Sequence, residues 1–289
     1  MTVTTLTMTA CAVCGSADAR RPLLAGSLVA CGRCDFVWTA AESAPLENLY
    51  AAGYFRGDAY EDYLQPSARR YEAGRRLSWL LRTGRVSSLV EAGCAGGFFV
   101  EAAVRAGIDA AGVELSPEMA AYARDQLQLP VWQGRFEAAP LEAPVQAVCA
   151  FHVLEHVEDP NAFVRTAWKL LEPGGLLAVE VPNIASPAAK RLGLDWPGLQ
   201  PRYHRWHFGP TSLRRLVERH GFDVVVQDTA VFRFYMPGRF RRRHARHLLA
   251  PDVRNTRSIR LTHRRRGDLL RMIAQKPHRT SRVARRRLA

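Results

Sequence analysis

The chain reads Ser88-Leu-Val-Glu-Ala-Gly-Cys-Ala-Gly-Gly-Phe-Phe-Val100 near the end of its first third. An apolar run typical of a buried strand ends close to the acid Glu91, and a turn of small residues then opens a helix. Small residues let a ligand approach the backbone closely, and the free N–H groups at a helix N-terminus bind anionic groups. We therefore expect a strand–turn–helix unit with a ligand at its turn.

A second apolar run ends at Glu114 about 20 residues further on, within Gly112-Val-Glu-Leu-Ser116. An acid at this point is placed to accept both hydroxyls of a ribose. The order of strand, turn, helix, strand and acid predicts an adenosine-containing ligand, with a purely structural turn as the alternative. The small residues do not follow the GxGxxG spacing of NAD sites, which disfavours NAD. The candidate cofactor-binding residues are Glu91, Gly93, Cys94, Ala95, Gly97, Glu114, Leu115, Phe136 and His152.

Apolar runs alternate with amphipathic stretches from residue 87 to about 236. The expected strands are Ser88–Ala92, Ala110–Glu114, Val131–Gln133, Ala147–Ala150, Leu176–Val181 and Phe222–Gln227. The expected helices are Phe98–Ala106, Pro117–Leu127, Asn161–Leu171 and Ser212–His220. This alternation predicts an α/β fold with a Rossmann-like, doubly wound and mainly parallel sheet.

Two CxxC pairs, Cys11-Ala-Val-Cys14 and Cys31-Gly-Arg-Cys34, lie 16 residues apart near the N-terminus. Paired thiolates at such spacing are typical of a four-cysteine zinc site, whereas a redox CxxC is usually single. Four protein ligands close the coordination sphere, so the ion is expected to be structural. The sequence therefore predicts a small zinc-ribbon-like module and Zn²⁺ as a bound metal.

The charge of the chain is concentrated at its C-terminal end. The net charge is +14, yet 19 of the 41 Lys and Arg residues and only two of the 27 acids lie from Arg233 onward. The remainder carries a slight negative charge, so its pocket need not serve a polyanion. The basic tail is interpreted as a solvated extension, an anchor to an anionic membrane surface, or, less favoured, a contact to nucleic acid.

The chain contains no run of 18 apolar residues, so no membrane span is predicted. The first ten residues lack the pattern of a secretory signal. The expected compartment is the cytoplasm, with peripheral membrane association through the tail as an option.

From Cys11 to about Val231 the chain resembles bacterial class I methyltransferases that carry an N-terminal zinc-binding segment. The similarity covers about three quarters of the chain and rests on Glu91–Gly97, Glu114, Phe151-His-Val-Leu-Glu-His-Val157 with Asp159-Pro160, Leu171-Glu-Pro-Gly-Gly-Leu176 with Val181-Pro-Asn183, and His204-Arg-Trp-His-Phe208 before Gly221-Phe222. The resemblance implies the class I methyltransferase fold, S-adenosyl-L-methionine as cofactor, and Glu114 as the acid that binds its ribose.

Four histidines are the candidate catalytic residues. A methyltransferase must align the acceptor and in some cases deprotonate it, and imidazole is the usual proton carrier near neutral pH. His152 directly follows the fourth expected strand and is the candidate base or acceptor-positioning group, whereas His156 is expected to be structural. His204 and His207, in an aromatic loop, are candidates for acceptor contact. A packing role is the alternative for each of them.

Three positions depart from the family's pattern. Ala95 replaces a usual glycine, and Gln146 replaces a usual aspartate before the fourth strand. Arg135 stands where an acid often meets the adenine amine, so the adenine is expected to rest against Phe136 or to rely on main-chain contacts.

The expected organisation is a zinc-ribbon-like module (1–42), a Tyr-rich helical linker or lid (43–86), a cofactor-binding methyltransferase domain (87–236) and an Arg-rich extension (237–289). The predicted function is methyl transfer to oxygen, carbon or nitrogen of a small or lipid-linked metabolite, with a sugar or secondary metabolite favoured. The alternatives are an RNA methyltransferase that uses the basic tail and a non-catalytic binding protein with the same fold.

Overall fold

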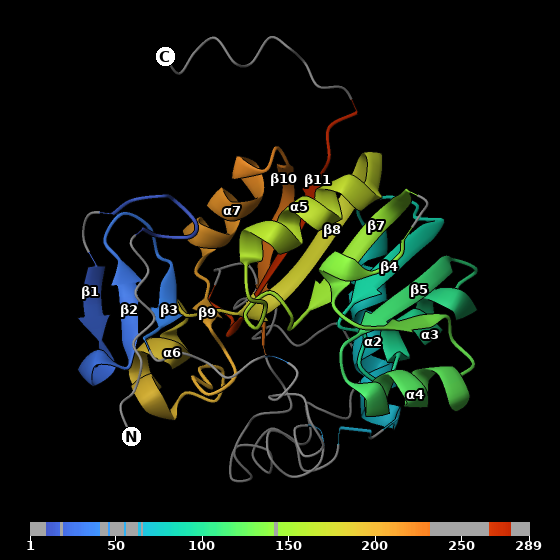
Figure 1. Ribbon diagram of the computed structural model, residues 1–289, viewed down its shortest axis with the longest axis horizontal. Coiled ribbons are helices and arrows are strands. Elements are labelled where there is room, and N and C mark those ends of the chain that lie inside the picture. Colours follow the sequence, from blue (N-terminus) through green and yellow to red (C-terminus); the bar gives the residue numbers. More distant parts are fainter. Residues whose placement is uncertain are drawn as a thin grey trace.

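The computed structural model of the chain describes residues 10–17, 20–40, 46, 55, 63–64, 66–141, 144–231 and 266–278. Seven strands form one sheet in the order β10-β11-β8-β7-β4-β5-β6 (Figure 1). Their bounds are β4 (Ser88–Ala92), β5 (Asp109–Glu114), β6 (Val131–Gln133), β7 (Val145–Phe151), β8 (Leu171–Pro182), β10 (Asp223–Ala230) and β11 (Leu269–Gln275). The pairs among β4 to β8 are all parallel, and β11 is antiparallel to both neighbours. The predicted mainly parallel sheet is confirmed.

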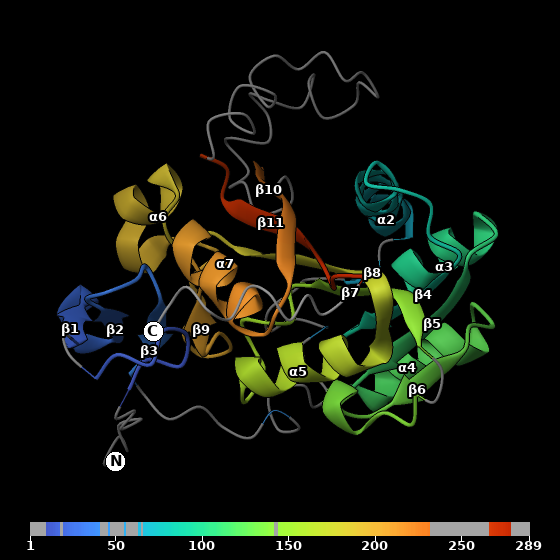
Figure 2. The ribbon, with the colours of Figure 1, turned by 90° about the horizontal axis from the view of Figure 1, so that it is seen from above.

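Helices cover both faces of this sheet (Figure 2). The clusters of buried side chains assign α2 (Pro66–Leu81), α3 (Phe98–Arg105) and α4 (Pro117–Asp125) to one face, and α5 (Pro160–Leu170) and α7 (Pro210–Arg219) to the other. Two of these helices begin at side-chain caps, because Ser116 accepts a hydrogen bond from the Met119 N–H and Asp159 from the Asn161 N–H. The predicted alternation of strands and helices along the chain is thus confirmed.

Strand β11 corrects the predicted limit of the catalytic domain at residue 236. Residues 269–275 lie between β8 and β10, and Met272 and Ile273 are fully buried. Arg271 pairs with Asp228 of β10 at 2.7 Å, and its guanidinium lies over the ring of Trp79 in α2. Part of the Arg-rich extension is therefore integral to the main sheet. The remaining tail residues, 232–265 and 279–289, and the predicted lipid or nucleic-acid contacts that involve them, lie outside the described residues.

The cysteine module, defined here as residues 10–17 and 20–40, contains β1 (Arg20–Leu23), η1 (Leu24–Gly26), β2 (Leu28–Cys31) and β3 (Val37–Thr39). These strands are antiparallel, and β9 (Trp206–His207) joins β3 from the catalytic part of the chain. Phe36 and Trp38 of the module are buried in the same cluster as Trp206. Beside the module, α6 (Pro187–Leu192) and η4 (Gly193–Asp195) follow β8. The module is therefore built into the catalytic domain rather than tethered to it.

The Tyr-rich segment is described only in part. Besides α2 and residues 82–86, the structure describes Leu46, Phe55, Tyr63 and Leu64 of this segment, and Tyr50, Tyr54 and Tyr60 lie outside the described residues. Within the described part of the chain, no helix combines the length and apolar character that crossing a bilayer requires.

Candidate active site

A pocket that is partly open to solvent lies at the carboxyl ends of β4, β5 and β7. Open α/β sheets bind ligands at this edge. The lining includes several predicted site residues: Gly93, Ala95, Glu114, Leu115, Phe136, His152 and His156. The structure therefore brings most of the predicted cofactor residues and two of the candidate histidines to one cavity.

The turn after β4 is held against the end of β5. The N–H groups of Gly93 and Cys94 both donate to the Val113 carbonyl, at 2.7 and 3.1 Å. Gly93 has φ +66°, and a Cβ there would lie 2.4 Å from Val153 Cγ2. Ala95 also has positive φ, at +45°, a conformation that favours glycine. The turn thus keeps the geometry of a glycine-rich loop despite the Ala95 departure.

Glu114 closes one side of this turn. Its Oε2 accepts a hydrogen bond from the Ala95 N–H and its Oε1 from the Ser116 N–H, each at 2.7 Å. Burial raises the pKa of Glu114, although these hydrogen bonds oppose the shift. A carboxylate offers about four lone-pair sites, so about two stay available for further donors. The side chain is thus fixed and retains the acceptor capacity that ribose hydroxyls require.

Three of the predicted cofactor residues do not line the pocket. Glu91 is buried beneath the turn, and this burial raises its pKa well above the ordinary value. Cys94 directs its Sγ toward Gly112, and Gly97 packs against Leu129 and Ala123. These residues support the turn after β4 and do not line the pocket, so they are not placed to contact the cofactor.

The adenine-side departures have separate structural explanations. Phe136, in η3 (Phe136–Ala138), is buried with its ring centroid 4.9 Å from that of Phe163, and both rings line the pocket. Arg135 forms a two-pronged ion pair with Glu158, at 2.5 and 2.9 Å. Gln146 accepts a hydrogen bond from the Ser87 N–H at the amino end of β4. Gln146 therefore lies away from the pocket, and its hydrogen bond stabilises the sheet.

A charged face of α2, which was not predicted from the sequence, also lines the pocket. Arg69, Glu72 and Arg76 share this face, and Arg76 donates to Glu180 Oε1 at 2.5 and 3.0 Å. Burial disfavours both charges, but their mutual attraction holds the pKa of Glu180 well below its ordinary value. Two signals could have revealed the pair: the i, i+3, i+7 spacing on α2 and the single acid inside the apolar run Leu176–Val181.

His152 lies between two carboxylates. Its Nδ1 is 3.2 Å from Glu155 Oε1 and its Nε2 is 3.5 Å from Glu180 Oε1. Burial disfavours the imidazolium, but hydrogen bonds and attraction from Glu155 and Glu180 outweigh burial and raise the pKa of His152 from 6.5 to about 9. The ring is therefore a cation at neutral pH and becomes a proton acceptor only in its neutral fraction.

The raised pKa of His152 makes stability depend on pH. The folded chain binds this proton more tightly than the unfolded chain, so the stabilisation is complete below about pH 6.5 and lost as pH rises through about 9. We expect the free energy of unfolding to fall by up to about 3 kcal/mol over that range, and His152→Gln to remove this part of the slope. Urea unfolding of both proteins from pH 6 to pH 10 measures the difference. Parallel curves would contradict the prediction.

The other three histidines are buried and neutral. Burial lowers the pKa of His156, His204 and His207, the last to about 3. His156 Nδ1 is 3.1 Å from the Tyr203 carbonyl, and its ring centroid is 4.6 Å from that of His204. His156 lines the pocket, whereas His204 and His207 lie behind it. We therefore keep His152 and His156 as candidates for acceptor contact.

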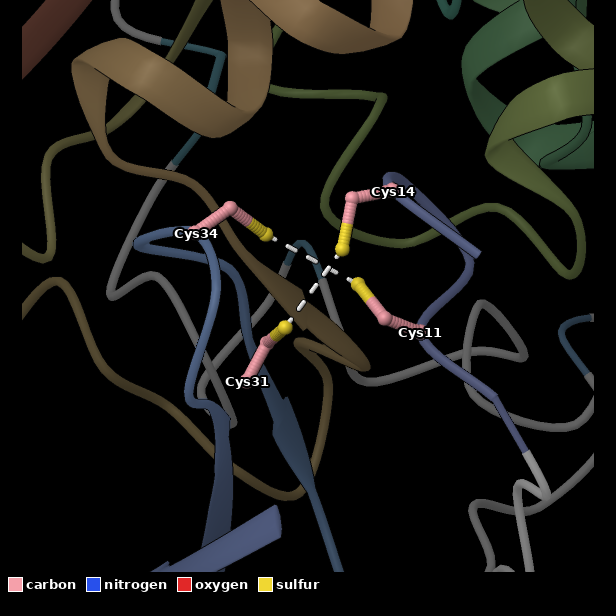
Figure 3. Close-up of side chains that lie close together, drawn as sticks. All are labelled: Cys11, Cys14, Cys31 and Cys34. Atoms are coloured by element: carbon pink, nitrogen blue, oxygen red, sulfur yellow. Dashed lines mark hydrogen bonds between the residues drawn. The ribbon is translucent and has the colours of Figure 1, made fainter. Parts of the chain in front are cut away.

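The four module cysteines converge on one point (Figure 3). The Cys11 and Cys34 sulfurs are 3.8 Å apart, those of Cys14 and Cys31 are 3.5 Å apart, and all four lie within 4.8 Å of one another. Zn–S bonds of about 2.3 Å in a tetrahedron place sulfurs about 3.8 Å apart. The cluster therefore fits a four-thiolate zinc ion, with no position left for a substrate.

Comparison with known proteins agrees with this geometry. A family model described as a methyltransferase domain matches residues 66–227, which is more than half of the chain. The ubiquinone biosynthesis O-methyltransferase of Cereibacter sphaeroides is 31% identical over 156 residues, covering 50% of this chain and 63% of that protein. The Xanthomonas campestris enzyme of the same name is 34% identical over 113 residues, covering 37% and 47%. The chain thus spans less than two thirds of these curated relatives.

Solved structures share the fold at low sequence identity. Magnesium protoporphyrin IX methyltransferase from Synechocystis, with bound SAH, aligns with a TM-score of 0.54 at 15% identity, over 80% of this chain and 97% of that chain. Phosphoethanolamine N-methyltransferase 2 from Haemonchus contortus, in complex with S-adenosyl-L-methionine, aligns with 0.54 at 16% identity, over 84% and 64%. With its sheet order and its matched domain, the chain belongs to the class I S-adenosylmethionine-dependent methyltransferase family.

Proposed function

We propose that the chain transfers a methyl group from S-adenosyl-L-methionine to an oxygen of a small or lipid-linked acceptor, with Zn²⁺ as a structural ion in the cysteine module. The observation that carries this proposal is the shared pocket, in which the Gly93 turn and Glu114 face His152 and the charged side of α2. The relatives named as ubiquinone biosynthesis O-methyltransferases support oxygen as the methylated atom. Sugar and secondary-metabolite acceptors are compatible with the same chemistry.

The residues divide into a cofactor side and an acceptor side. Glu114 would bind the ribose hydroxyls, the turn beginning at Gly93 would receive the rest of the cofactor, and Phe136 would flank its base. When bound, the cofactor supplies an electrophilic methyl group and a thioether leaving group. His152 would hold the acceptor oxygen and, in its neutral form, take up the hydroxyl proton as the new C–O bond forms. Glu155 and Glu180 stabilise the resulting imidazolium.

Calorimetric titration of the cofactor tests the proposed cofactor side. Glu114→Ala is expected to weaken the binding of S-adenosylmethionine and S-adenosylhomocysteine at least tenfold, a loss of about 1.4 kcal/mol, because the ribose acceptor is removed. Asp109→Ala, at the exposed opposite end of β5, is the matched control and should bind like the wild type. A folded wild-type protein that binds neither compound would exclude the enzyme and favour the non-catalytic alternative.

A further inference from the structure

We propose that the cysteine module positions the histidine side of the pocket, with Thr39 as the positioning residue. This inference rests on the proposed function, because it treats that side as the acceptor site. The module itself contributes no residue to the lining of the pocket. Its influence passes through two hydrogen-bonded steps, first from β3 to the segment 203–208 and then from that segment to the turn after β7.

Thr39 makes the first step. Its buried hydroxyl donates to the His204 carbonyl at 2.7 Å and lies 3.0 Å from His207 Nε2. Its backbone N–H donates to the Arg205 carbonyl at 3.0 Å. The last residue of β3 therefore contacts His204, Arg205 and His207 of the segment 203–208, at a sequence distance of about 165 residues.

The segment 203–208 makes the second step. The N–H groups of Arg205 and Trp206 both donate to the Glu155 carbonyl, at 2.9 and 3.1 Å. The Trp206 indole N–H donates to the Val157 carbonyl at 2.6 Å. Residues 152–157 form the turn that presents His152 and His156 to the pocket. Any shift of the segment 203–208 is thus transmitted to the two candidate acceptor-contacting side chains.

The metal-binding knuckle is hydrogen-bonded to the start of β3. The Cys31 N–H donates to the Phe36 carbonyl at 2.9 Å, which closes the knuckle directly before β3. The Asp35 carboxylate accepts hydrogen bonds from the Thr211 and Ser212 N–H groups, at 2.9 and 2.5 Å, and so caps α7. A zinc ion at the cysteines would fix the knuckle, and the knuckle fixes the strand that carries Thr39.

Hydrogen exchange followed by mass spectrometry on the full-length, zinc-loaded protein tests this coupling without any acceptor. In Thr39→Val, which keeps the branched shape but lacks the hydroxyl, amides of residues 203–208 and 153–158 are expected to exchange at least tenfold faster. Residues 109–116, which carry Glu114, should keep their wild-type rates. Thr39→Ser restores the hydroxyl and should restore protection in both segments.

Thr229→Val is the matched control, because Thr229 is equally buried and its Oγ1 accepts from the Gly267 N–H at 3.0 Å. Its effect should stay within β10 and β11. Removal of zinc from the wild type with a chelator should accelerate amide exchange in residues 203–208 and in residues 31–40. Faster exchange confined to 31–40, or a uniform rise over the whole sheet, would overturn the proposal. Hydrogen exchange is measured without cofactor, so its result does not depend on cofactor binding. A failure of the proposed function is detected separately, in the calorimetric titration.

Discussion

Glu180→Ala is expected to lower the free energy of unfolding by about 3–5 kcal/mol, because it leaves a buried cation without its main partner. Glu180 is 4% exposed in β8 and pairs with Arg76, whose side chain is 14% exposed. The same substitution removes one of the two carboxylates beside His152. Chemical denaturation at neutral pH measures the loss, and the pKa of His152, followed by NMR, should fall toward its ordinary value.

Glu218→Ala is the contrasting control for Glu180→Ala. Its pair with Arg214 is about as short, at 3.0 Å, but both side chains are at least 40% exposed. Water screens such a pair, so the expected loss is at most about 0.5 kcal/mol. Replacing both buried partners, as Arg76→Met with Glu180→Leu, should recover much of the stability, since no charge is then left unpaired. Equal losses for the buried and the exposed glutamate would refute this account of the pair.

Loss of the cysteine cluster is the second large effect that we expect. The purified wild type should contain one zinc ion per chain, and Cys34→Ser should retain little of it and melt at a much lower temperature. Structural zinc contributes about 10–16 kcal/mol in small domains that depend on it. Here the module shares its core with the catalytic domain through Phe36 and Trp206, so its collapse should be detected in the main unfolding transition.

Cys149→Ala provides the comparison for the zinc experiment. Cys149 is fully buried in β7, far along the chain from the module, so this variant should keep its zinc and lose only the packing of one sulfur. For both variants, metal analysis measures the zinc content, and thermal melting with and without a chelator measures the stability. A zinc-free wild type that melts at the same temperature as the untreated protein would contradict the structural role.

The parallel core of the sheet could be predicted because each strand has a local signature. Apolar runs such as Ser88–Ala92 and Val131–Gln133 coincide with β4 and β6 residue for residue. Pro117 and Pro160 begin helices directly after capping side chains, which is also a local pattern. Such signals need no knowledge of distant contacts.

Outside the cysteine module, the strands β9 and β11 escaped prediction because their partners are distant. The seven residues of β11 form a short apolar run inside an Arg-rich tail, and composition alone assigned that tail to the solvent. The strand β9 has only two residues, Trp206 and His207, and exists because β3 pairs with it. Neither local propensity nor periodicity carries information about a pairing of this kind.

The candidate site divides in the same way. The turn from Gly93 and the acid Glu114 follow strand ends and were predicted from spacing. The charged face of α2 was missed because this helix precedes the region of alternating strands and helices. Nothing in its sequence indicated that it would pack over the pocket. Its partner Glu180 was included in an apolar run as an ordinary strand residue. Ion pairs across elements far apart in the sequence become visible only after the elements are assembled.

The position of β11 between β8 and the edge strand β10 has a consequence for the order of assembly during synthesis. β11 lies between β8 and β10 and joins them, so this half of the sheet stays open until residue 275 has emerged from the ribosome. Until then the hydrogen-bonding edge of β8 is free, and β10 has no neighbour among the described strands. Exposed strand edges invite pairing with other chains. During synthesis, β8 and β10 therefore keep these edges unpaired until β11 has emerged.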